Sequence, residues 1–403
     1  MHNALIIGAG IAGPVAAMAL QRAGFEAVIY EAREQGADDV GAFLTLQTNG
    51  VSALRAIGAD HVVAELGFPT PTMRLHSTTG KHLGTVPNGG PLPDGTVSHT
   101  VERADLYQAL RDEALRRGIG LEYGKRLADA THSSGRVTAT FRDGSGASGD
   151  VLIGCDGIRS RTRAIIDPAS PPARFVPVLN IGGFAPIVTS GAEVGDFHMI
   201  FGARAFFGWT SAPGGETWWF ANPPAQHEPT EEELRGITTE QWHRRLEALF
   251  AVDRSPAVEV IRATPHPLRG WATYDIPTIP TWHAGSMVVI GDAAHATAPS
   301  SGQGASLAIE DAVVLAKCLR DRPTIQAALE SYEGLRRERV ERVVAAGART
   351  SSMKAVGPVG RRVRDLVMPF FLRRVAADGA ASLAWMHQYH IDWDSPTPAA
   401  ATS

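Results

Sequence analysis

Three glycines and one glutamate near the N-terminus have the types and the spacing needed to bind a dinucleotide. Gly8, Gly10 and Gly13 form the pattern Gly-Ala-Gly-Ile-Ala-Gly, and Glu31 follows Gly13 by eighteen positions. The first glycine permits a tight turn, the second lets the backbone approach a pyrophosphate, and the third allows a helix to pack closely on a strand. The Glu31 carboxylate can accept hydrogen bonds from both hydroxyls of a ribose. A glycine-rich loop that binds nothing is the alternative interpretation.

Two aspartates stand where apolar strands of an α/β sheet are expected to end. Asp156 and Gly157 follow the apolar run that begins at Val151, and Asp292 follows the run from Met287 to Ile290. Ligands of open α/β sheets bind at the carboxyl ends of the strands, so both carboxylates are candidates for ligand contact. Asp156 could instead only cap the helix that is predicted to follow it.

Two predicted helices begin in ways that favour an anionic or planar neighbour. Gly302-Gln303-Gly304 opens a long helix, whose unpaired N–H groups can approach such a group closely. Arg103 opens another helix, where the helix dipole disfavours a cation unless a phosphate or carboxylate lies nearby. His295 could act as a base, but a histidine between alanines is more often structural.

The elements around these residues alternate between strand and helix before the composition changes. A strand at Leu5–Ile7, helical spacing from Val15 to Leu20 and a second strand at Ala27–Tyr30 form the start of a nucleotide-binding sheet. Residues 171–226 are rich in aromatic and β-forming residues, which predicts a twisted, largely antiparallel sheet with one apolar face. The prolines and glycines of residues 71–101 predict hairpins.

The aromatic sheet could form a wall for a flat, apolar ligand, although an aromatic stripe is more often core than pocket. A capped helix is predicted to follow this sheet over residues 228–250. The candidates for a substrate pocket, chosen only because their segment should line it, are His198, Arg204, Trp209 and Asn222.

The chain after Pro358 is basic and amphipathic. Arginines alternate there with apolar residues such as Leu366 and Phe370. Packing against the sheet or against a partner subunit is favoured, and a lipid-facing surface helix is the alternative. Residues Pro396–Ser403 are expected to be disordered.

The bulk properties exclude several classes of protein. The 403 residues, 44% of them hydrophobic, suffice for one or two domains, and the net charge of -4 gives no global basic field for nucleic acid. Cys155 and Cys318 indicate buried thiols of a reducing compartment, without metal-ligand spacing. A strand begins within four residues of the N-terminus, which leaves no room for a signal peptide, and no apolar run approaches the ~20 residues that span a bilayer. We therefore expect a cytoplasmic protein without metal, nucleic-acid partner or stable membrane insertion.

The chain contains three motifs in a fixed order: Gly8–Gly13 with Glu31, Asp156-Gly157 with Ser160 and Arg163, and Gly291-Asp292 with Pro299 and Gly302–Gly304. Together they resemble the motifs of the single-component FAD-dependent aromatic hydroxylases, the group A flavoprotein monooxygenases with the p-hydroxybenzoate hydroxylase fold. The resemblance covers roughly residues 3–345 and includes Arg103, which matches the arginine of an Arg-x-x-Leu helix in the family. It implies an α/β fold in which a Rossmann-type FAD-binding domain, a mostly parallel sheet with helices, is interrupted by a mostly antiparallel substrate-binding sheet and followed by C-terminal helices. The implied boundaries are residues 1–70, 98–168 and 282–345 for the FAD-binding domain, 71–97 and 169–281 for the substrate-binding domain, and 346–403 for the C-terminal helical segment and tail.

By this resemblance, the first glycines would hold the FAD pyrophosphate, Glu31 the adenosine ribose and Asp292 the ribityl chain. Asp156-Gly157 would serve both FAD and the nicotinamide cofactor, and Pro299 would lie near the face of the ring where oxygen reacts. The implied cofactor-binding residues are Gly8, Gly10, Ala12, Gly13, Glu31, Arg33, Arg103, Leu127, Asp156, Gly157, Asp292, Pro299, Gly302, Gly304 and Ala305.

The resemblance also implies the reaction. NAD(P)H would reduce FAD, O2 would add to give a flavin hydroperoxide, and one oxygen atom would pass to an aromatic or polycyclic substrate of the secondary-metabolite type. Because the flavin carries this chemistry, no acid–base residue is assigned. A Baeyer–Villiger or epoxidising monooxygenase, an FAD-dependent reductase or dehydrogenase, and a flavin-bound redox sensor are the alternatives, while the motif and lysine of a flavin-dependent halogenase are not evident. Two questions stay open: whether the nicotinamide cofactor is NADH or NADPH, and whether the protein is a monomer or a homodimer.

Overall fold

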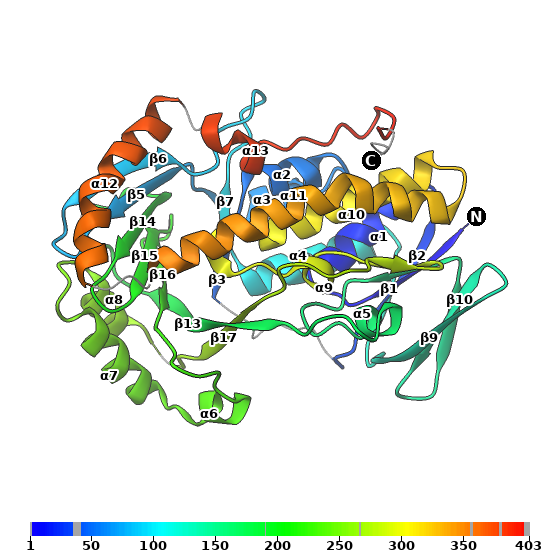
Figure 1. The fold of residues 1–403 in the computed structure, drawn as a ribbon, viewed down its shortest axis with the longest axis horizontal. Helices are drawn as coiled ribbons and strands as arrows, with labels where there is room; N and C mark the ends of the chain where they lie inside the picture. Colours follow the sequence, from blue (N-terminus) through cyan, green and yellow to red (C-terminus); the bar gives the residue numbers. More distant parts are fainter. Residues whose placement is uncertain are drawn as a thin grey trace.

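The computed structural model describes residues 2–34, 42–189, 191–265, 267–354, 358–378 and 381–398. They form an α/β fold in which two large sheets lie at opposite ends of the molecule, with α10 and α11 along the long axis between them (Figure 1). The predicted fold class is confirmed. Residues 35–41 lie outside the described residues.

The first sheet has β1 near its centre and contains mostly parallel strands. Its order is β18-β19-β12-β1-β2-β8, and each pairing is parallel except that of β18 with β19. The strands are β1 (Asn3–Ile7), β2 (Glu26–Tyr30), β8 (Gly120–Glu122), β12 (Val151–Gly154), β18 (His283–Ala284) and β19 (Met287–Val289).

Both faces of this sheet are covered, because neighbouring side chains of a strand point to opposite faces. The Ile6 side chain lies on the side of Gly13, at the start of α1, whereas the Leu5 side chain lies against Gly149 of a small antiparallel sheet. That sheet has the order β11-β10-β9. Its strands are β9 (Leu127–Ser133), β10 (Arg136–Phe141) and β11 (Gly146–Gly149). This double covering explains why Ala4–Ile7 is an unbroken buried run.

Helices α1, α10 and α11 pack in succession beside the parallel sheet. Val15, Met18 and Ala19 of α1 are fully buried, as their three- and four-residue spacing requires. The helices of this region are α1 (Ala12–Arg22), α2 (Thr48–Arg55), α3 (His61–Leu66), α4 (Arg103–Arg116), α5 (Arg161–Ile166), α9 (Asp292–His295), η1 (Pro299–Ser301), α10 (Gly304–Asp321) and α11 (Ile325–Lys354).

The second large sheet is mostly antiparallel and takes its strands from two separate parts of the chain. Its order is β17-β13-β16-β15-β14-β5-β6, in which only β14 and β5 pair in parallel. The strands are β5 (Thr72–His76), β6 (His82–Pro87), β13 (Arg174–Ala185), β14 (Asp196–Phe201), β15 (Phe206–Ser211), β16 (Thr217–Asn222) and β17 (Gly270–Asp275). We retain the predicted domain boundaries as a proposal.

A small third sheet links the two large sheets. It has the order β3-β7-β4, with strands β3 (Phe43–Leu46), β4 (Phe68–Pro69) and β7 (His99–Glu102). The backbone N–H of Arg103, directly after β7, donates to Ala42 O at 3.1 Å. This bond fixes the start of β3 beside the start of α4.

The helix predicted over residues 228–250 is in fact two helices, α6 (Glu231–Gly236) and α7 (Thr239–Phe250). Gly236 ends α6, and Thr238 begins α7 with a second capping box in which Thr238 and Gln241 satisfy each other's backbone N–H groups. Helix α8 (Ala257–Ala263) follows and packs beside α7.

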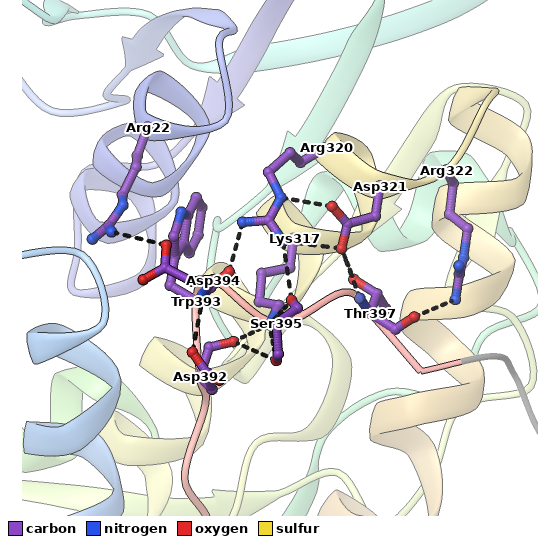
Figure 2. A network of polar contacts seen from close by, with 10 residues as sticks. All are labelled: Arg22, Lys317, Arg320, Asp321, Arg322, Asp392, Trp393, Asp394, Ser395 and Thr397. Atoms are coloured by element: carbon purple, nitrogen blue, oxygen red, sulfur yellow. Dashed lines mark hydrogen bonds and ion pairs between the residues drawn. The ribbon is translucent and has the colours of Figure 1, made fainter.

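The C-terminal segment contains α12 (Pro358–Ala377), η2 (Ala381–Leu383) and α13 (Ala384–His387), and then an extended run to Pro398. We call residues 384–398 the C-terminal strap. Arg320 donates to Trp393 O at 2.6 Å, and the N–H and hydroxyl of Thr397 both donate to Asp321 at 2.7 Å (Figure 2). The expected disorder is therefore wrong for residues 396–398, because the end of α10 satisfies their polar groups; residues 399–403 lie outside the described part.

The strap also contains a buried aromatic anchor. Trp393 is 7% exposed, and the guanidinium groups of Arg22 and Arg320 each lie 4.9 Å from its ring centroid. Such stacking places two cations over one aromatic ring and joins α1 to α10 through the strap.

We predict that Trp393→Ala lowers the free energy of unfolding by about 3 kcal/mol, because it removes a buried aromatic side chain. Urea denaturation monitored by circular dichroism measures this loss. Asp394→Ala is the matched control, since the Asp394 side chain is 89% exposed and lies 3.8 Å from Arg22, and it should change stability by less than about 1 kcal/mol. Equal stability of the two variants would show that the strap does not pack in solution.

Candidate cofactor and active site

Four strand ends bring the sequence motifs to one edge of the parallel sheet. Ile7 pairs with Tyr30 on one side and with Gly154 on the other, and Gly154 pairs in turn with Val289. Parallel strands end at the same edge, so the residues that follow them lie side by side. Those residues are Glu31, Gly8, Asp156 and Asp292, in the order of their strands across the sheet.

In the turn from Gly8 to Gly13, two of the three motif glycines have no room for a side chain, and the third borders open space. A Cβ on Gly8, whose φ is +105°, would lie 2.6 Å from Cys155 O, and a Cβ on Gly13 would lie 1.9 Å from Gly8 O. A Cβ on Gly10 would meet nothing within 4 Å. Gly8 and Gly13 are therefore needed for folding, whereas Gly10 leaves room for a ligand.

Glu31 is already engaged with the turn. Its carboxylate accepts from the backbone N–H groups of Ala9 at 2.8 Å and of Arg33 at 3.0 Å. These bonds hold the carboxylate at the edge of the sheet beside the glycine turn. The Arg33 side chain is exposed.

Asp156 binds within its own segment. Its carboxylate accepts from Ser160 Oγ at 2.5 Å and from Thr162 N in the first turn of α5 at 2.9 Å, while the N-cap residue of α5 is Ser160. Gly157 has a φ of +74° and open space around it. Arg163 donates to Ala293 O at 2.8 Å and so ties this segment to α9.

Asp292 lies next to the start of α10, within electrostatic range of Arg103. A Cβ on Gly304 would lie 3.9 Å from the Asp292 carboxylate. Desolvation raises the pKa of Asp292, although Arg103 acts in the opposite direction, and the carboxylate remains reachable by solvent. Burial opposes the charge on Arg103, but the Tyr107 hydroxyl and Asp292 outweigh it and raise its pKa. The Arg103 side chain donates through Nε to the Tyr107 hydroxyl at 2.8 Å, and the anionic neighbour of Arg103 stays a prediction.

The N-termini of α1 and α10 fit anionic groups. The residues before them, Ile11 and Gln303, make no side-chain cap, and neither helix has an acidic residue in its first turn. Their first N–H groups and the positive ends of the helix dipoles are thus not neutralised by acidic side chains of the helices themselves. Gly302, with a φ of +62°, and exposed Pro299 lie just before α10.

A buried ionic network behind these motifs was not found from the sequence. Asp311 accepts from Gly291 N at 2.9 Å, from His295 Nε2 at 2.5 Å and from Arg336 Nε at 2.7 Å. Burial alone would raise the pKa of Asp311, but His295 and Arg336 lower it to about 2. His295 is 3% exposed and bound to Asp311, which is a structural role. The only sequence signal was an aspartate on the apolar side of a long helix.

The sequence likewise did not reveal the polar contacts near Gly302 and Gln303. Gln47 N donates to Ser306 Oγ at 3.1 Å, and Asn49 donates to Gln303 Oε1 at 2.9 Å. On the other side, Gln303 Nε2 donates to His387 of the C-terminal strap at 2.9 Å. Sequence spacing cannot reveal these contacts, because the residues are far apart in the chain.

The aromatic sheet meets the cofactor side of the molecule at β3. The Phe43 ring lies 5.7 to 6.4 Å from the rings of four residues on one face of the second sheet, and a Cβ on Gly182 would lie 3.4 Å from Ala42. The four residues are Phe184, Phe197, Trp218 and Phe220. We call this side of the sheet the Phe43 face.

The four predicted pocket residues do not lie together. His198 stacks on Trp209 with 4.8 Å between the ring centroids, and both belong to the opposite face, on which α7 and α8 pack. Arg204 donates to Ala248 O of α7 at 2.9 Å. Asn222 pairs with Phe206 and donates to Asn180 Oδ1 at 3.0 Å, so it belongs to the Phe43 face. Burial lowers the pKa of His198 to about 4.

Leu127 is buried beside a cavity of about 580 Å³ that adjoins the second motif. Four arginines line this cavity: one directly before β9, one directly after β10, one in the loop before α5 and one at the first residue of α5. They are Arg126, Arg142, Arg159 and Arg161, together with Ser160. Arg161 Nε donates to Ala128 O at 2.8 Å, which fixes one wall of the cavity.

Two kinds of feature are missing from the part of the chain that the structure covers. Within it, no three His, Cys, Asp or Glu side chains are grouped so as to hold a metal ion. Among the same residues, no helix has the length and apolar character required to cross a membrane.

Comparisons with known proteins agree with the motif analysis. The model of a family described as FAD binding domain matches residues 1–347. An FAD-dependent urate hydroxylase of Klebsiella pneumoniae is 30% identical over 345 residues, 85% of this chain and 88% of that protein, and the aurachin C monooxygenase/isomerase of Stigmatella aurantiaca is 30% identical over 367 residues, 89% of each. The structure of Klebsiella pneumoniae HpxO with FAD and uric acid superposes with a TM-score of 0.85 at 26% identity, covering 95% of this chain and 97% of that one. The chain therefore belongs to this FAD-binding family, that of the single-component FAD-dependent aromatic hydroxylases.

Proposed function

We propose that this protein uses NAD(P)H and O2 to hydroxylate an aromatic or polycyclic substrate of the secondary-metabolite type with FAD as its bound cofactor. The observation that carries the proposal is the position of β3. Ala42, directly before β3, binds Arg103, Phe43 contacts the aromatic face, and Gln47, directly after β3, binds Ser306 in the first turn of α10. A flat substrate on this face would lie beside the cofactor residues.

FAD would be held by residues from all three motifs. The turn at Gly8–Gly13 and the start of α1 would take the pyrophosphate, Glu31 the ribose and Asp292 the ribityl chain. The start of α10, with Gly302, Gly304 and Ala305, would face the flavin ring, and Pro299 would lie near its oxygen-reacting side. The remaining proposed contacts are Ala12, Arg33, Arg103, Leu127, Asp156 and Gly157.

When bound, FAD would supply electron transfer and oxygen activation. The protein would orient the substrate and exclude water from the site. The Phe43 face is suited to this task because its aromatic side chains exclude water and stack on flat rings. Phe197 is 4% exposed and Phe206 is 2% exposed, so solvent has little access to this part of the face. Asn222 is the one member of the predicted pocket set that we retain for substrate contact.

The arginine-lined cavity supports the use of a pyridine nucleotide. Four guanidinium groups around about 580 Å³ suit the phosphates of NAD(P)H, which they can bind through charge-assisted hydrogen bonds. The cavity adjoins Ser160 and so lies next to the second motif. We propose that Arg126 and Arg142 bind the nucleotide phosphates.

The function is tested with the purified holoenzyme. Aromatic compounds that accelerate NAD(P)H oxidation are identified, and their products are analysed by mass spectrometry after reaction under isotopically labelled O2. Labelled hydroxylated product supports the proposal. Substrate-dependent oxidation without label in the product would instead indicate a reductase or dehydrogenase, and a labelled ester or epoxide would indicate one of the other monooxygenase reactions.

We predict that Gly10→Val weakens FAD binding by about a hundredfold, because the side chain occupies the space proposed for the pyrophosphate. Titration of the apoprotein by flavin fluorescence measures the dissociation constant. Since a Cβ at Gly10 meets no protein atom within 4 Å, the apoprotein should keep its thermal stability. Gly214→Val, at another glycine with open space around it, should bind FAD normally. Unchanged FAD affinity of the Gly10 variant would contradict the proposed pyrophosphate site.

We also predict that the double substitution Arg126→Gln and Arg142→Gln raises the KM for NADPH by at least about tenfold, because charge-assisted bonds to a phosphate are lost. Steady-state kinetics gives the KM, and FAD affinity should not change. Arg244→Gln is the matched control, because Arg244 is an exposed residue of α7 outside the cavity. If the double variant keeps its KM for both NADPH and NADH, the nucleotide binds elsewhere.

A further inference from the structure

Helix α12 presents a continuous apolar stripe to solvent. Val363, Leu366, Val367, Phe370 and Phe371 follow one another at spacings of three and one, which places them on one side of a helix. Leu366 is 80% exposed, Phe370 is 69% exposed and Phe371 is 59% exposed. Single exposed apolar residues are ordinary, but a stripe of this length marks an interaction surface.

The other side of α12 holds the helix on the protein. Met368, Leu372 and Val375 pack into the cluster that contains Leu83 and Phe206. A Cβ on Gly84 of β6 would lie 2.7 Å from the Leu372 side chain, which shows how closely the helix approaches the sheet. Packing against the sheet therefore explains one face of α12 and leaves the stripe uncovered. Figure 1 shows α12 at the outer end of the molecule, beside β5 and β6.

The charge of α12 differs in sign from that of the rest of the protein. The segment Pro358–Ala377 contains five arginines and one aspartate, a net charge of +4, whereas the whole chain carries -4. All residues outside this helix therefore sum to -8. The arginines stand at both ends of the apolar stripe, at positions 361, 362, 373 and 374, while Arg364 bonds to its neighbour Asp365 at 2.9 Å.

We propose that α12 docks this protein on an anionic phospholipid surface. An apolar stripe flanked by arginines is the pattern of a helix that lies in the membrane interface, with its aromatic side chains at the headgroup boundary. The arginines add attraction to acidic headgroups, and the acidic remainder of the chain orients α12 toward the surface. This is docking on the surface of a bilayer and requires no helix that crosses it.

A second copy of the chain fits the stripe less well. A twofold axis across the helix would pair two copies of a segment that carries a net charge of +4. An axis along the helix would bring equivalent arginines together. Both arrangements oppose like charges, whereas acidic headgroups neutralise them.

Docking has a consequence for the substrate class, which rests on the proposed function. The inner side of α12 packs in the same cluster as Phe206 and Phe220, and both belong to the Phe43 face. A docked α12 would thus place the proposed substrate face close to the lipid. The matching substrate is an aromatic compound that partitions into membranes.

The test is sedimentation of the FAD-loaded full chain with vesicles made of equal parts of phosphatidylcholine and phosphatidylglycerol. We expect binding that falls as salt rises from about 0.05 to 0.5 M and that is at least about tenfold weaker with phosphatidylcholine alone. The double variant Phe370→Ser and Phe371→Ser should reduce partitioning at least about tenfold. The double variant Arg373→Gln and Arg374→Gln should bind these vesicles more weakly, and its binding should depend less on salt.

Val188→Ser with Val252→Ser is the control, because these exposed valines lie outside α12 and should leave binding unchanged. Light scattering on all four proteins measures the oligomeric state. Absence of vesicle binding, or equal binding by the phenylalanine variant, overturns the proposal. So does a dimer that the phenylalanine variant converts to monomers without any vesicle binding. Sedimentation involves no turnover, so its outcome is independent of that of the proposed function.

Discussion

The carboxylate of Asp311 organises the centre of this protein. It receives the N–H of Gly291 at the start of α9, the ring of His295 at the end of α9 and the guanidinium of Arg336 in α11. Arg336 also pairs with Glu310 at 2.7 Å, with both side chains fully buried. Buried charges cost several kcal/mol each in desolvation, so such a network is stable only when its partners are complete. The position of the third motif, and with it the start of α10, depends on this set of contacts.

Around this centre the chain separates two tasks. The parallel sheet and the two uncapped helix starts form a polar edge, and the second sheet presents an aromatic face toward it through β3. The polar edge suits a large anionic cofactor, and the aromatic face suits a flat substrate that must react away from water.

Local sequence patterns predicted the edge of the first sheet well, because strand ends of a parallel sheet have a fixed geometry. Gly8, Glu31, Asp156 and Asp292 required only that their strands be recognised. The substrate side was harder to predict. His198 and Phe197 are neighbours in β14 and therefore point to opposite faces, and only the packing of α7, α8 and β3 decides which face meets the cofactor edge. The contacts of Asp311, Gln303 and Thr397 also join residues distant in sequence, and no local pattern encodes them.

The strap gives α10 a second support that arrives late in the chain. Gln303 and His387 are 84 residues apart, and the bonds of Asp321 to Thr397 join residues 76 apart. During synthesis, the parallel sheet and α10 leave the ribosome before the strap can bind them. At that point of synthesis, α10 lacks its outer brace. Truncation before residue 384 would therefore remove this brace from α10 while every strand of the parallel sheet is retained.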